Sequence, residues 1–345
     1  MNKPTLWIMC GLSGSGKSTI ATQIANENPN TIIVSSDAIR EELTGNYEDQ
    51  EHNEEVFKIF HDRIRKNLEN KKNVIADATN LTMKSRRAIM MKVNGLEVHK
   101  VCVIIPKPFE QCKEDNLHRE HPVPDFVLDK QIMKFQIPFY NEGFSEIILY
   151  NRNDSLEEYQ MGSINLFLAM WGFNQKTPYH NMTLDEHCLN TYKLFCKKIP
   201  HKTLLNLEYT NGFAMGAKLH DFGKLMVQTF DENGVAHYYG HENAGSYFIL
   251  SQMIKPLVWT DDMLLDCCFL INYHMMPFNW DTDKAKQRWK ERFGEYKYKM
   301  LLDFNKCDKV QLINVNSKMR KNLFYFLTKK GRTFPLVKIS FFERY

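Results

Sequence analysis

Short apolar runs alternate with amphipathic stretches along the first 150 residues. The runs are rich in β-branched residues and unbroken, which is typical of strands buried in a parallel sheet. They cover residues 6–10, 31–35, 74–77, 101–105 and 147–150. Helical spacing marks the stretches between them, at residues 18–25, 51–69, 82–93 and 109–120. Such alternation predicts βαβ units and an α/β fold, a parallel sheet with helices on both faces.

The second part of the chain has a different pattern. Beyond residue 151 the periodicity is mostly helical, and no further alternating strands follow. A chain of 345 residues is longer than one ordinary domain. We place the joint in the polar run 151–155. The pattern therefore predicts an α/β domain over residues 1–152 and an all-α domain over residues 156–345.

Composition adds a few constraints. The 43% of hydrophobic and 25% of charged residues fit globular domains, and the formal charge of +4 permits a polyanionic partner without requiring one. The eight cysteines are scattered and include no CxxC pair, which suits reduced thiols in a cytoplasm. No signal peptide and no run long enough to span a bilayer is found. We therefore expect a cytoplasmic protein without membrane association.

Residues 11–18 follow the first strand, open a helix and read GLSGSGKS. In this context the spacing GxxxxGK[ST] is a phosphate-binding loop, because its backbone N–H groups and the helix N-terminus face one anion. Lys17 is expected to reach the β- and γ-phosphates, and Ser18 to hold Mg²⁺. ATP or GTP binding is thus predicted for eight residues: Gly11, Ser13, Gly14, Ser15, Gly16, Lys17, Ser18 and Thr19.

Polar residues also follow the next strands, where ligands of such sheets bind. Asp37 follows the second strand and is placed to accept a hydroxyl proton, while Arg40 lies one helical turn away and could bind an acceptor phosphate. Asp77 closes the third strand and could orient Mg²⁺. Arg119 follows the fourth strand and could stabilise the transferring phosphoryl group. The alternatives are capping roles for the acids and solvated faces for the arginines.

These residues carry a resemblance. Residues 1 to about 150 resemble the P-loop kinase module of polynucleotide 5′-hydroxyl kinases, on the segments 11–19, 36–40, 77–80 and 112–124. The resemblance implies that Asp37 is the general base toward a 5′-OH, that Arg40 contacts the acceptor's neighbouring phosphate and that Arg119 contacts ATP. It departs at Asp115, where the family often has an arginine. No Asn-Lys-x-Asp guanine signature follows the strands, so ATP is favoured over GTP.

A second constellation lies in the helical part. His187, the adjacent pair His220 and Asp221, and Asp308 combine imidazole with carboxylate, a donor set for Mn²⁺, Fe²⁺, Co²⁺, Ni²⁺ or Zn²⁺. Four ligands leave positions for water and a phosphate oxygen, as metal-assisted hydrolysis requires. Any one of these histidines alone would more often be structural. Their order resembles the HD-domain metal-dependent phosphohydrolases over residues 185–310.

Further residues of this part are candidates by the same resemblance. His241 and His274 fall where many HD proteins have additional histidines, which implies a second ion or a phosphate contact, and Lys224 could contact a phosphate. The stretches 284–293 and 296–299 mix cations with aromatic residues, a composition suited to single-stranded nucleic acid. The alternative for these stretches is a solvated basic amphipathic helix.

Together these features lead to one hypothesis, a bifunctional enzyme that repairs nucleic-acid ends. One domain would phosphorylate 5′-OH ends with ATP and Mg²⁺, with Asp37 as base. The other would use a divalent metal at Asp221 and its neighbours to remove a 3′-phosphate or a 2′,3′-cyclic phosphate. The partners would be RNA or DNA ends, single-stranded and more often RNA, and a separate ligase. Two alternatives stay open: a small-molecule or nucleoside kinase fused to an HD nucleotide phosphohydrolase, and an ATP-gated, nucleotide-sensing binding protein.

Overall fold

The computed structural model describes residues 3–47, 49, 51–150, 166–178, 181–199, 211–252 and 260–311. The predicted joint at residues 151–155 lies outside these ranges. The chain divides into two compact units. The first contains residues 1–131 and 136–152, and the second contains residues 132–135 and 153–345. Each unit is described by itself.

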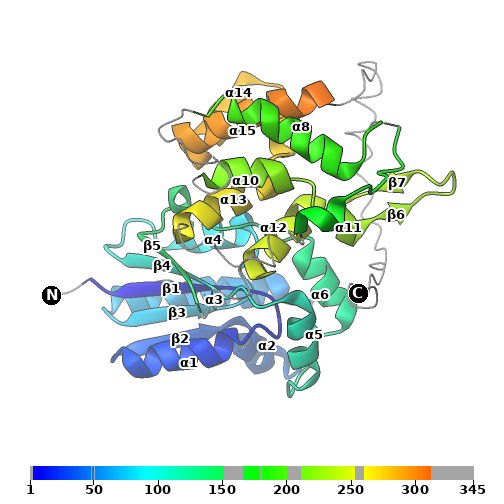
Figure 1. Cartoon of the computed structure of the whole chain (residues 1–345). Helices are drawn as coiled ribbons and strands as arrows, with labels where there is room; N and C mark the ends of the chain where they lie inside the picture. The colour runs from blue at the N-terminus through cyan, green and yellow to red at the C-terminus, as the bar shows by residue number, and fades with distance from the viewer. Residues whose placement is uncertain are drawn as a thin grey trace. The chain divides into compact units, whose positions relative to one another are not determined.

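A five-stranded sheet forms the centre of the first unit (Figure 1). Its order is β2-β3-β1-β4-β5, and every neighbouring pair is parallel. The strands are β1 (Thr5–Cys10), β2 (Thr31–Ser35), β3 (Asn73–Asp77), β4 (His99–Ile104) and β5 (Glu146–Leu149). The predicted parallel sheet with flanking helices is confirmed.

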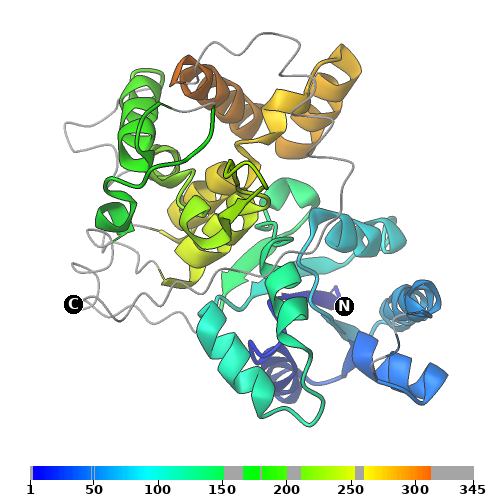
Figure 2. The ribbon, with the colours of Figure 1, turned by 90° about the vertical axis from the view of Figure 1, so that its right-hand side faces the viewer.

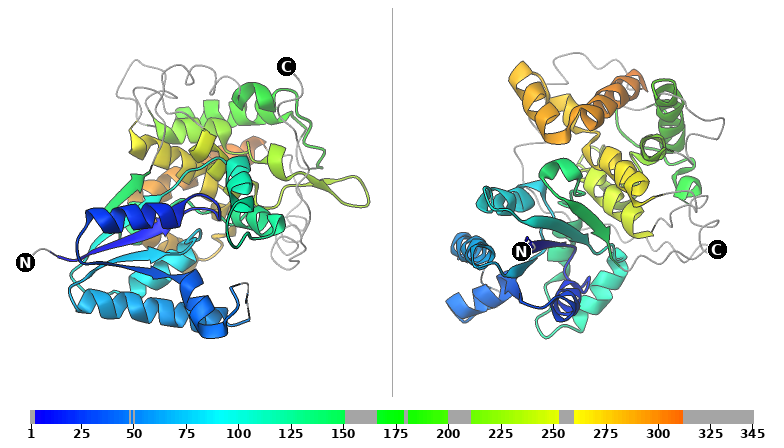
Figure 3. Two further views of the ribbon diagram at one scale, coloured as in Figure 1. Left: turned by 90° about the horizontal axis from the view of Figure 1, so that it is seen from below. Right: turned by 90° about the vertical axis from the view of Figure 1, so that its left-hand side faces the viewer.

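Helices cover both faces of this sheet. They are α1 (Lys17–Glu27), α2 (Ser36–Thr44), α3 (Asn53–Glu69), α4 (Met83–Lys92), α5 (Phe109–Leu117), α6 (Asp125–Ile132) and the 3₁₀ helix η1 (Tyr140–Glu142). Side chains alternate along each strand, so Met9 and Val103 pack against Ile20 and Ile24 of α1. Helices α3 and α4 lie side by side on the opposite face (Figure 3). The buried residues of α3 recur every fourth position, as its sequence pattern predicts.

Two local features differ from the expected helices. The predicted helix 109–120 ends at Leu117, so Arg119 lies in a loop and not on the helix. Asn116 explains this end, because its side chain donates to the Val123 carbonyl at 2.7 Å and accepts from the Val123 amide at 3.1 Å. These two hydrogen bonds close the connection between α5 and α6, which run as a helical hairpin (Figure 2). The second feature is the length of α2. The sequence predicts a helical turn over residues 37–40, and the helix runs over Ser36–Thr44, capped by the Ser35 hydroxyl, which accepts from the Ala38 amide.

The second unit is mostly helical. It contains α8 (Leu184–Cys196), α10 (Gly212–Leu219), α11 (Lys224–Val227), α12 (His241–Gln252), α13 (Asp261–Tyr273), η2 (Met276–Asn279), α14 (Asp283–Phe293) and α15 (Glu295–Gln311). Helices α10 and α13 approach closely, because a Cβ at Gly212 would lie 1.9 Å from the Met263 carbonyl oxygen. Gly216, one turn later, faces the Cys267 carbonyl in the same way.

The expectation of an all-α second domain is wrong in one detail. Strands β6 (Thr229–Phe230) and β7 (Ala236–His237) form a short antiparallel hairpin. Its turn is set by Asp231, whose carboxylate accepts from the amides of Asn233 and Val235, and by Gly234 at φ 74°. Two residues per strand are too few for an alternating pattern to be visible in the sequence. Within the described residues, every helix is too short or too polar to cross a bilayer.

A buried ion pair joins α4 to η1 in the first unit. Arg86 donates to the two carboxylate oxygens of Glu142 at 2.9 and 2.7 Å and to the Asn80 carbonyl at 3.0 Å. Both side chains are almost fully buried. Burial raises the pKa of Glu142, and the charge of Arg86 opposes that rise. The pair thus fixes the loop that follows β3.

Replacing Glu142 by alanine is expected to destabilise the first unit by about 3–5 kcal/mol, because it leaves the Arg86 guanidinium buried without its carboxylate. Glu69→Ala is the matched control, since it removes the acid of a half-exposed pair with Arg65 and should cost less than about 1 kcal/mol. Hydrogen exchange of β1 and β4 peptides across a urea series measures both. Equal losses in the two variants would contradict a stabilising role for the buried pair.

Candidate functional site

The loop 11–16 joins β1 to α1, and its conformation requires glycine at two positions. Gly14 has φ 77° and Gly16 has φ 90°, both in the left-handed region. A Cβ at Gly14 would also lie 2.1 Å from the Cys112 carbonyl oxygen of α5. Gly16 is the N-cap of α1, so the first N–H groups of the helix remain directed at the loop. This is the backbone arrangement that binds phosphate groups.

Lys17 and Ser18 begin α1 beside Asp77. The Lys17 ammonium donates to the Leu12 carbonyl at 2.7 Å, and the Ser18 hydroxyl donates to Asp77 Oδ2 at 2.9 Å. Burial lowers the pKa of Lys17 and raises the pKa of Asp77, and the attraction between these two groups opposes both shifts. A hydroxyl and a carboxylate oxygen side by side are ligands that Mg²⁺ prefers. The residues present therefore fit the predicted Mg²⁺ site.

Asp37, Arg40 and Arg119 lie together at the carboxyl end of β2. Asp37 is in the first turn of α2, and its Oδ1 accepts from Arg40 Nη1 at 3.0 Å. Arg119 Nη2 lies 3.9 Å from Asp37 Oδ2. The charges of Asp37 and Arg119 contribute to the pKa values of both Lys17 and Asp77, so these four groups share one site. The Asp37 side chain is 44% exposed, which leaves it accessible to an acceptor.

Two supporting residues were not found from the sequence. Gln131 of α6 accepts from the Ser13 amide at 2.8 Å and donates to the Ser13 hydroxyl at 2.9 Å. Asn53 of α3 accepts from Arg40 Nη2 at 2.9 Å. Both contacts depend on the tertiary fold, and no local motif announces them. Asp115, the position that departs from the family pattern, pairs with Lys107 on the same side of α5.

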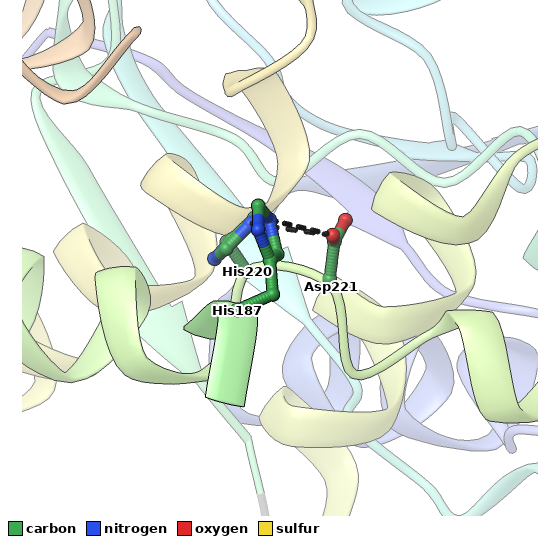
Figure 4. Close-up of side chains that lie close together, drawn as sticks. All are labelled: His187, His220 and Asp221. Atoms are coloured by element: carbon green, nitrogen blue, oxygen red, sulfur yellow. Dashed lines mark hydrogen bonds and ion pairs between the residues drawn. The ribbon is translucent and has the colours of Figure 1, made fainter. Parts of the chain in front are cut away.

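The second constellation also converges, within the helical unit (Figure 4). His187 comes from α8, His220 caps the C-terminus of α10 with Asp221 next to it, and Asp308 comes from α15. His187 Nε2 lies 3.1 Å from His220 Nε2, 3.3 Å from Asp221 Oδ2 and 3.2 Å from Asp308 Oδ1. His220 Nε2 lies 3.3 Å from Asp221 Oδ2 and 3.6 Å from Asp308 Oδ1.

Three of these groups fit a divalent cation. Ligand atoms about 2.1 Å from an ion in tetrahedral arrangement lie about 3.4 Å from one another, as those of His187, His220 and Asp221 do. Asp308 Oδ1 lies near the two histidine nitrogens. The Nδ1 atom of His220 lies 3.0 Å from the Ala217 carbonyl, a contact that orients the ring so that Nε2 faces the cluster. All four side chains are buried.

The opposed charges also shift the pKa values of the acids and bases in this cluster. Burial acts to lower the pKa of His220, but the neighbouring Asp221 carboxylate more than offsets it and holds that pKa well above its usual value. Burial acts to raise the pKa of Asp308, yet hydrogen bonding from His187 and the charge of His220 bring it down to about 2. Asp308 therefore remains an anion at any ordinary pH.

His241 and His274 form a second group around the other oxygen of Asp221. Asp221 Oδ1 lies 3.1 Å from His241 Nε2 and 3.5 Å from His274 Nε2, and these two nitrogens are 3.4 Å apart. Their Nδ1 atoms lie 2.8 Å from the Tyr238 carbonyl and 2.7 Å from the Ile271 carbonyl. Asp221 thus stands between two pairs of histidines, with one oxygen toward each.

Lys224 lies against the same carboxylate. Its ammonium is 2.7 Å from Asp221 Oδ2 and donates to Gln175 Oε1 at 2.8 Å. Lys224, for which the sequence predicts a phosphate contact, therefore already neutralises Asp221. Gln175 was not found from the sequence, because it belongs to no motif and lies 49 positions from Lys224.

The aromatic residues of the basic stretch pack mainly on one another. Trp289 stacks on Phe293 with ring centroids 5.2 Å apart, and Trp280 stacks on Tyr298 at 5.0 Å. Phe293 and Tyr298 are buried, while Tyr296 is 54% exposed. This packing favours the basic amphipathic helix over a surface for stacking nucleobases.

Comparisons with known proteins concern the first unit. Residues 6–138 match the family model AAA_33, described as an AAA domain. L-seryl-tRNA(Sec) kinase of Methanococcus maripaludis is 28% identical over 175 residues, which make up 44% of this chain and 68% of that protein. The first unit therefore matches an AAA-domain family model over most of its length, and part of the chain is similar to a known kinase.

Solved structures are similar at a lower level. A chain of the Pnkp1/Rnl/Hen1 RNA repair complex has 24% identity and a TM-score of 0.36, over 39% of this chain and 44% of that chain. A gluconokinase from Sinorhizobium meliloti 1021 has 18% identity and a TM-score of 0.32, over 44% of this chain and 86% of that chain. The chain thus spans less than half the length of the RNA repair chain that it matches.

Gly14→Ala is expected to lower the affinity for Mg·ATP by about tenfold or more, because the new Cβ forces the loop away from Cys112. Gly45→Ala is the matched control. Gly45 has a similar φ of 64° but open space around its Cβ, so it adds backbone strain of about 1–2 kcal/mol without moving the loop. Isothermal titration with Mg·ATP measures the affinities. An unchanged affinity in the Gly14 variant would contradict this account of the loop.

Proposed function

We propose that the protein heals nucleic-acid ends, with a 5′-hydroxyl kinase in its first unit and an HD-type metal-dependent phosphohydrolase in its second. The kinase proposal rests on one observation. The carboxylate of Asp37, which is accessible and held by Arg40, shares a site with Lys17, Asp77 and Arg119 at the end of the glycine loop. A base, a phosphate-binding loop and cations for the transferring group are the parts that phosphoryl transfer needs.

The kinase step uses these residues in defined roles. Asp37 accepts the proton of the attacking hydroxyl, the hydroxyl oxygen forms a bond to the γ-phosphorus of ATP, and the bond to the β-phosphate oxygen breaks to release ADP. Lys17 and Arg119 offset the charge on the phosphoryl oxygens. Arg40 orients Asp37 and is placed to bind the phosphate next to the acceptor hydroxyl. Ser18 and Asp77 would hold Mg²⁺, which would offset the negative charge of the phosphate oxygens.

RNA is the acceptor that we favour. The L-seryl-tRNA(Sec) kinase to which the first unit is similar has a tRNA in its name. That name also supports a second candidate, a kinase that phosphorylates an aminoacyl group on tRNA. The two candidates differ in the hydroxyl that is phosphorylated, so Ser-tRNA and a 5′-OH oligonucleotide tested side by side distinguish them. A small-molecule or nucleoside kinase is the outcome if neither is turned over.

The hydrolase proposal rests on the convergence of His187, His220 and Asp221 at mutual distances that suit one cation, with Asp308 beside the two histidines. These residues would hold a divalent ion, whose chemistry would be activation of a water and polarisation of a phosphoryl oxygen. The Lys224 ammonium holds the Asp221 carboxylate in place at Oδ2. His241 and His274 face the other oxygen, Oδ1. The substrate we propose is a 3′-phosphate or 2′,3′-cyclic phosphate end.

One experiment tests both halves. An RNA with a 5′-OH and a 2′,3′-cyclic phosphate is incubated with ATP and Mn²⁺, and its ends are mapped by mass spectrometry. We expect the wild type to give 5′-phosphate and 3′-OH ends. Asp37→Asn should lower the rate of 5′ phosphorylation by about 10²–10⁴-fold and leave 3′ processing intact. Asp221→Asn should do the reverse.

Each outcome has a clear reading. Tight ATP binding with no change at either end would reject the enzyme in favour of a nucleotide-sensing module. Phosphorylation that persists in Asp37→Asn would reject Asp37 as the base. Removal of the 3′ group by the Asp221 variant would reject the metal centre as its catalyst.

His220→Ala is expected to weaken divalent metal binding by more than about tenfold, because even outer contacts of metal ligands are worth 10–100-fold. His237→Ala is the control; this histidine lies on β7 and pairs with Asp231 away from the cluster. Metal content after dialysis, measured by mass spectrometry, and titration with Mn²⁺ give the result. A wild type that binds no divalent ion, or equal losses in both variants, would contradict the site.

A further inference from the structure

A groove of about 900 Å³ lies between α3 and α4 of the first unit. These two helices run side by side on one face of the sheet (Figure 3). At 1.5 Å per residue they are about 25 and about 15 Å long. The kinase mechanism described above does not use this groove, so its residues call for a separate explanation.

One end of the groove reaches the kinase site. Asn53 lines the groove and accepts from Arg40 Nη2 at 2.9 Å, while Arg40 Nη1 holds Asp37 at 3.0 Å. Asn80 also lines the groove, and its amide donates to the Met9 carbonyl at the end of β1. The groove therefore starts one side chain away from the proposed base and leads away from it along α3.

The walls of the groove are basic at the rim and apolar inside. Lys58 of α3 and Lys84 of α4 are both exposed and face it from opposite helices. The rings of Phe57 and His61 lie 6.2 Å apart along the α3 wall. Three lysines and one acid, Glu54, line the groove, and one of these lysines, Lys92, pairs with Asp62. Cations that follow a backbone, together with flat rings that accept bases, are what a single strand of nucleic acid requires.

We propose that this groove binds the single-stranded nucleotides next to the reacting 5′ end of a polynucleotide acceptor. The proposal rests on the kinase function proposed above and specifies its substrate as a chain rather than a nucleotide. Arg40 and Asn53 mark the end where the reacting nucleotide lies. The α4 wall, about 15 Å long, has room for only a few nucleotides of a single strand. Lys58 and Lys84 neutralise phosphates from the two sides.

The test compares two acceptors. The full chain is assayed with ATP and either a 5′-OH RNA decamer or a nucleoside 3′-monophosphate, which is too short to enter the groove. Changing Lys58 and Lys84 together to alanine should raise the KM for the decamer about three- to twentyfold. The KM for the nucleoside 3′-monophosphate should not change. The slope of log KM against log salt for the decamer should fall by about two, one for each lysine.

The control variant carries Lys66→Ala and Lys72→Ala. It makes the same change in net charge, but Lys66 is in the last turn of α3 outside the groove and Lys72 precedes β3. We expect it to behave as the wild type with both acceptors. Thermal unfolding checks that both double variants fold equally well. An equal KM rise in the control, or an equal rise with the short acceptor, would overturn the proposal.

Binding without ATP separates this proposal from the kinase proposal. Fluorescence anisotropy with the labelled decamer measures affinity whether or not phosphate is transferred. The Lys58 and Lys84 variant should bind the decamer about three- to twentyfold more weakly than the control does. Loss of turnover on every acceptor, with this binding difference intact, would reject the kinase alone. Equal competition by polyglutamate of matched charge would reject a nucleic-acid groove and indicate an acidic protein partner.

Discussion

The side chain of Asn80 ties together the ends of two neighbouring strands. Its amide donates to the Met9 carbonyl of β1 at 2.8 Å and to the Ala78 carbonyl after β3 at 3.3 Å, from a backbone with φ 44°. The main-chain carbonyl of Asn80 accepts from the buried Arg86. These bonds set the distance between the glycine loop, which follows β1, and Asp77, which ends β3. The nucleotide site depends on that distance, because its loop and its acid come from different strands.

The sheet could be predicted from the sequence because its central strands β3, β1 and β4 are buried on both faces. Unbroken β-branched runs mark such strands, and the glycine loop is fixed by backbone conformations that only glycine adopts easily. The boundaries near Arg119 could not be predicted, because Asn116 ends α5 through bonds to Val123 that a helical pattern does not reveal. The β6–β7 hairpin escaped for a similar reason: Asp231 and its turn define it, not the periodicity of its strands.

The residues of the candidate sites also divide into those that could be predicted from the sequence and those that could not. Residues that carry charge or bind phosphate, such as Lys17 and Asp37, belong to short motifs and can be found in the chain. Residues that hold them in place, such as Asn53 and Gln131, are ordinary amides whose partners come from other elements. Gln131 lies 118 positions from Ser13, so only the folded chain brings them together. The sequence therefore reveals the residues that carry the chemistry of a site more readily than the residues that hold them in place.

Asp221 stands between two histidine pairs, with one oxygen directed at each. The orientation of each histidine pair therefore depends on the same Asp221 carboxylate. Variation in one pair is transmitted to its counterpart, so substitutions at His187 and His274 should show epistasis although they are on different helices. A change at either pair therefore alters the surroundings of the one carboxylate that the other pair contacts.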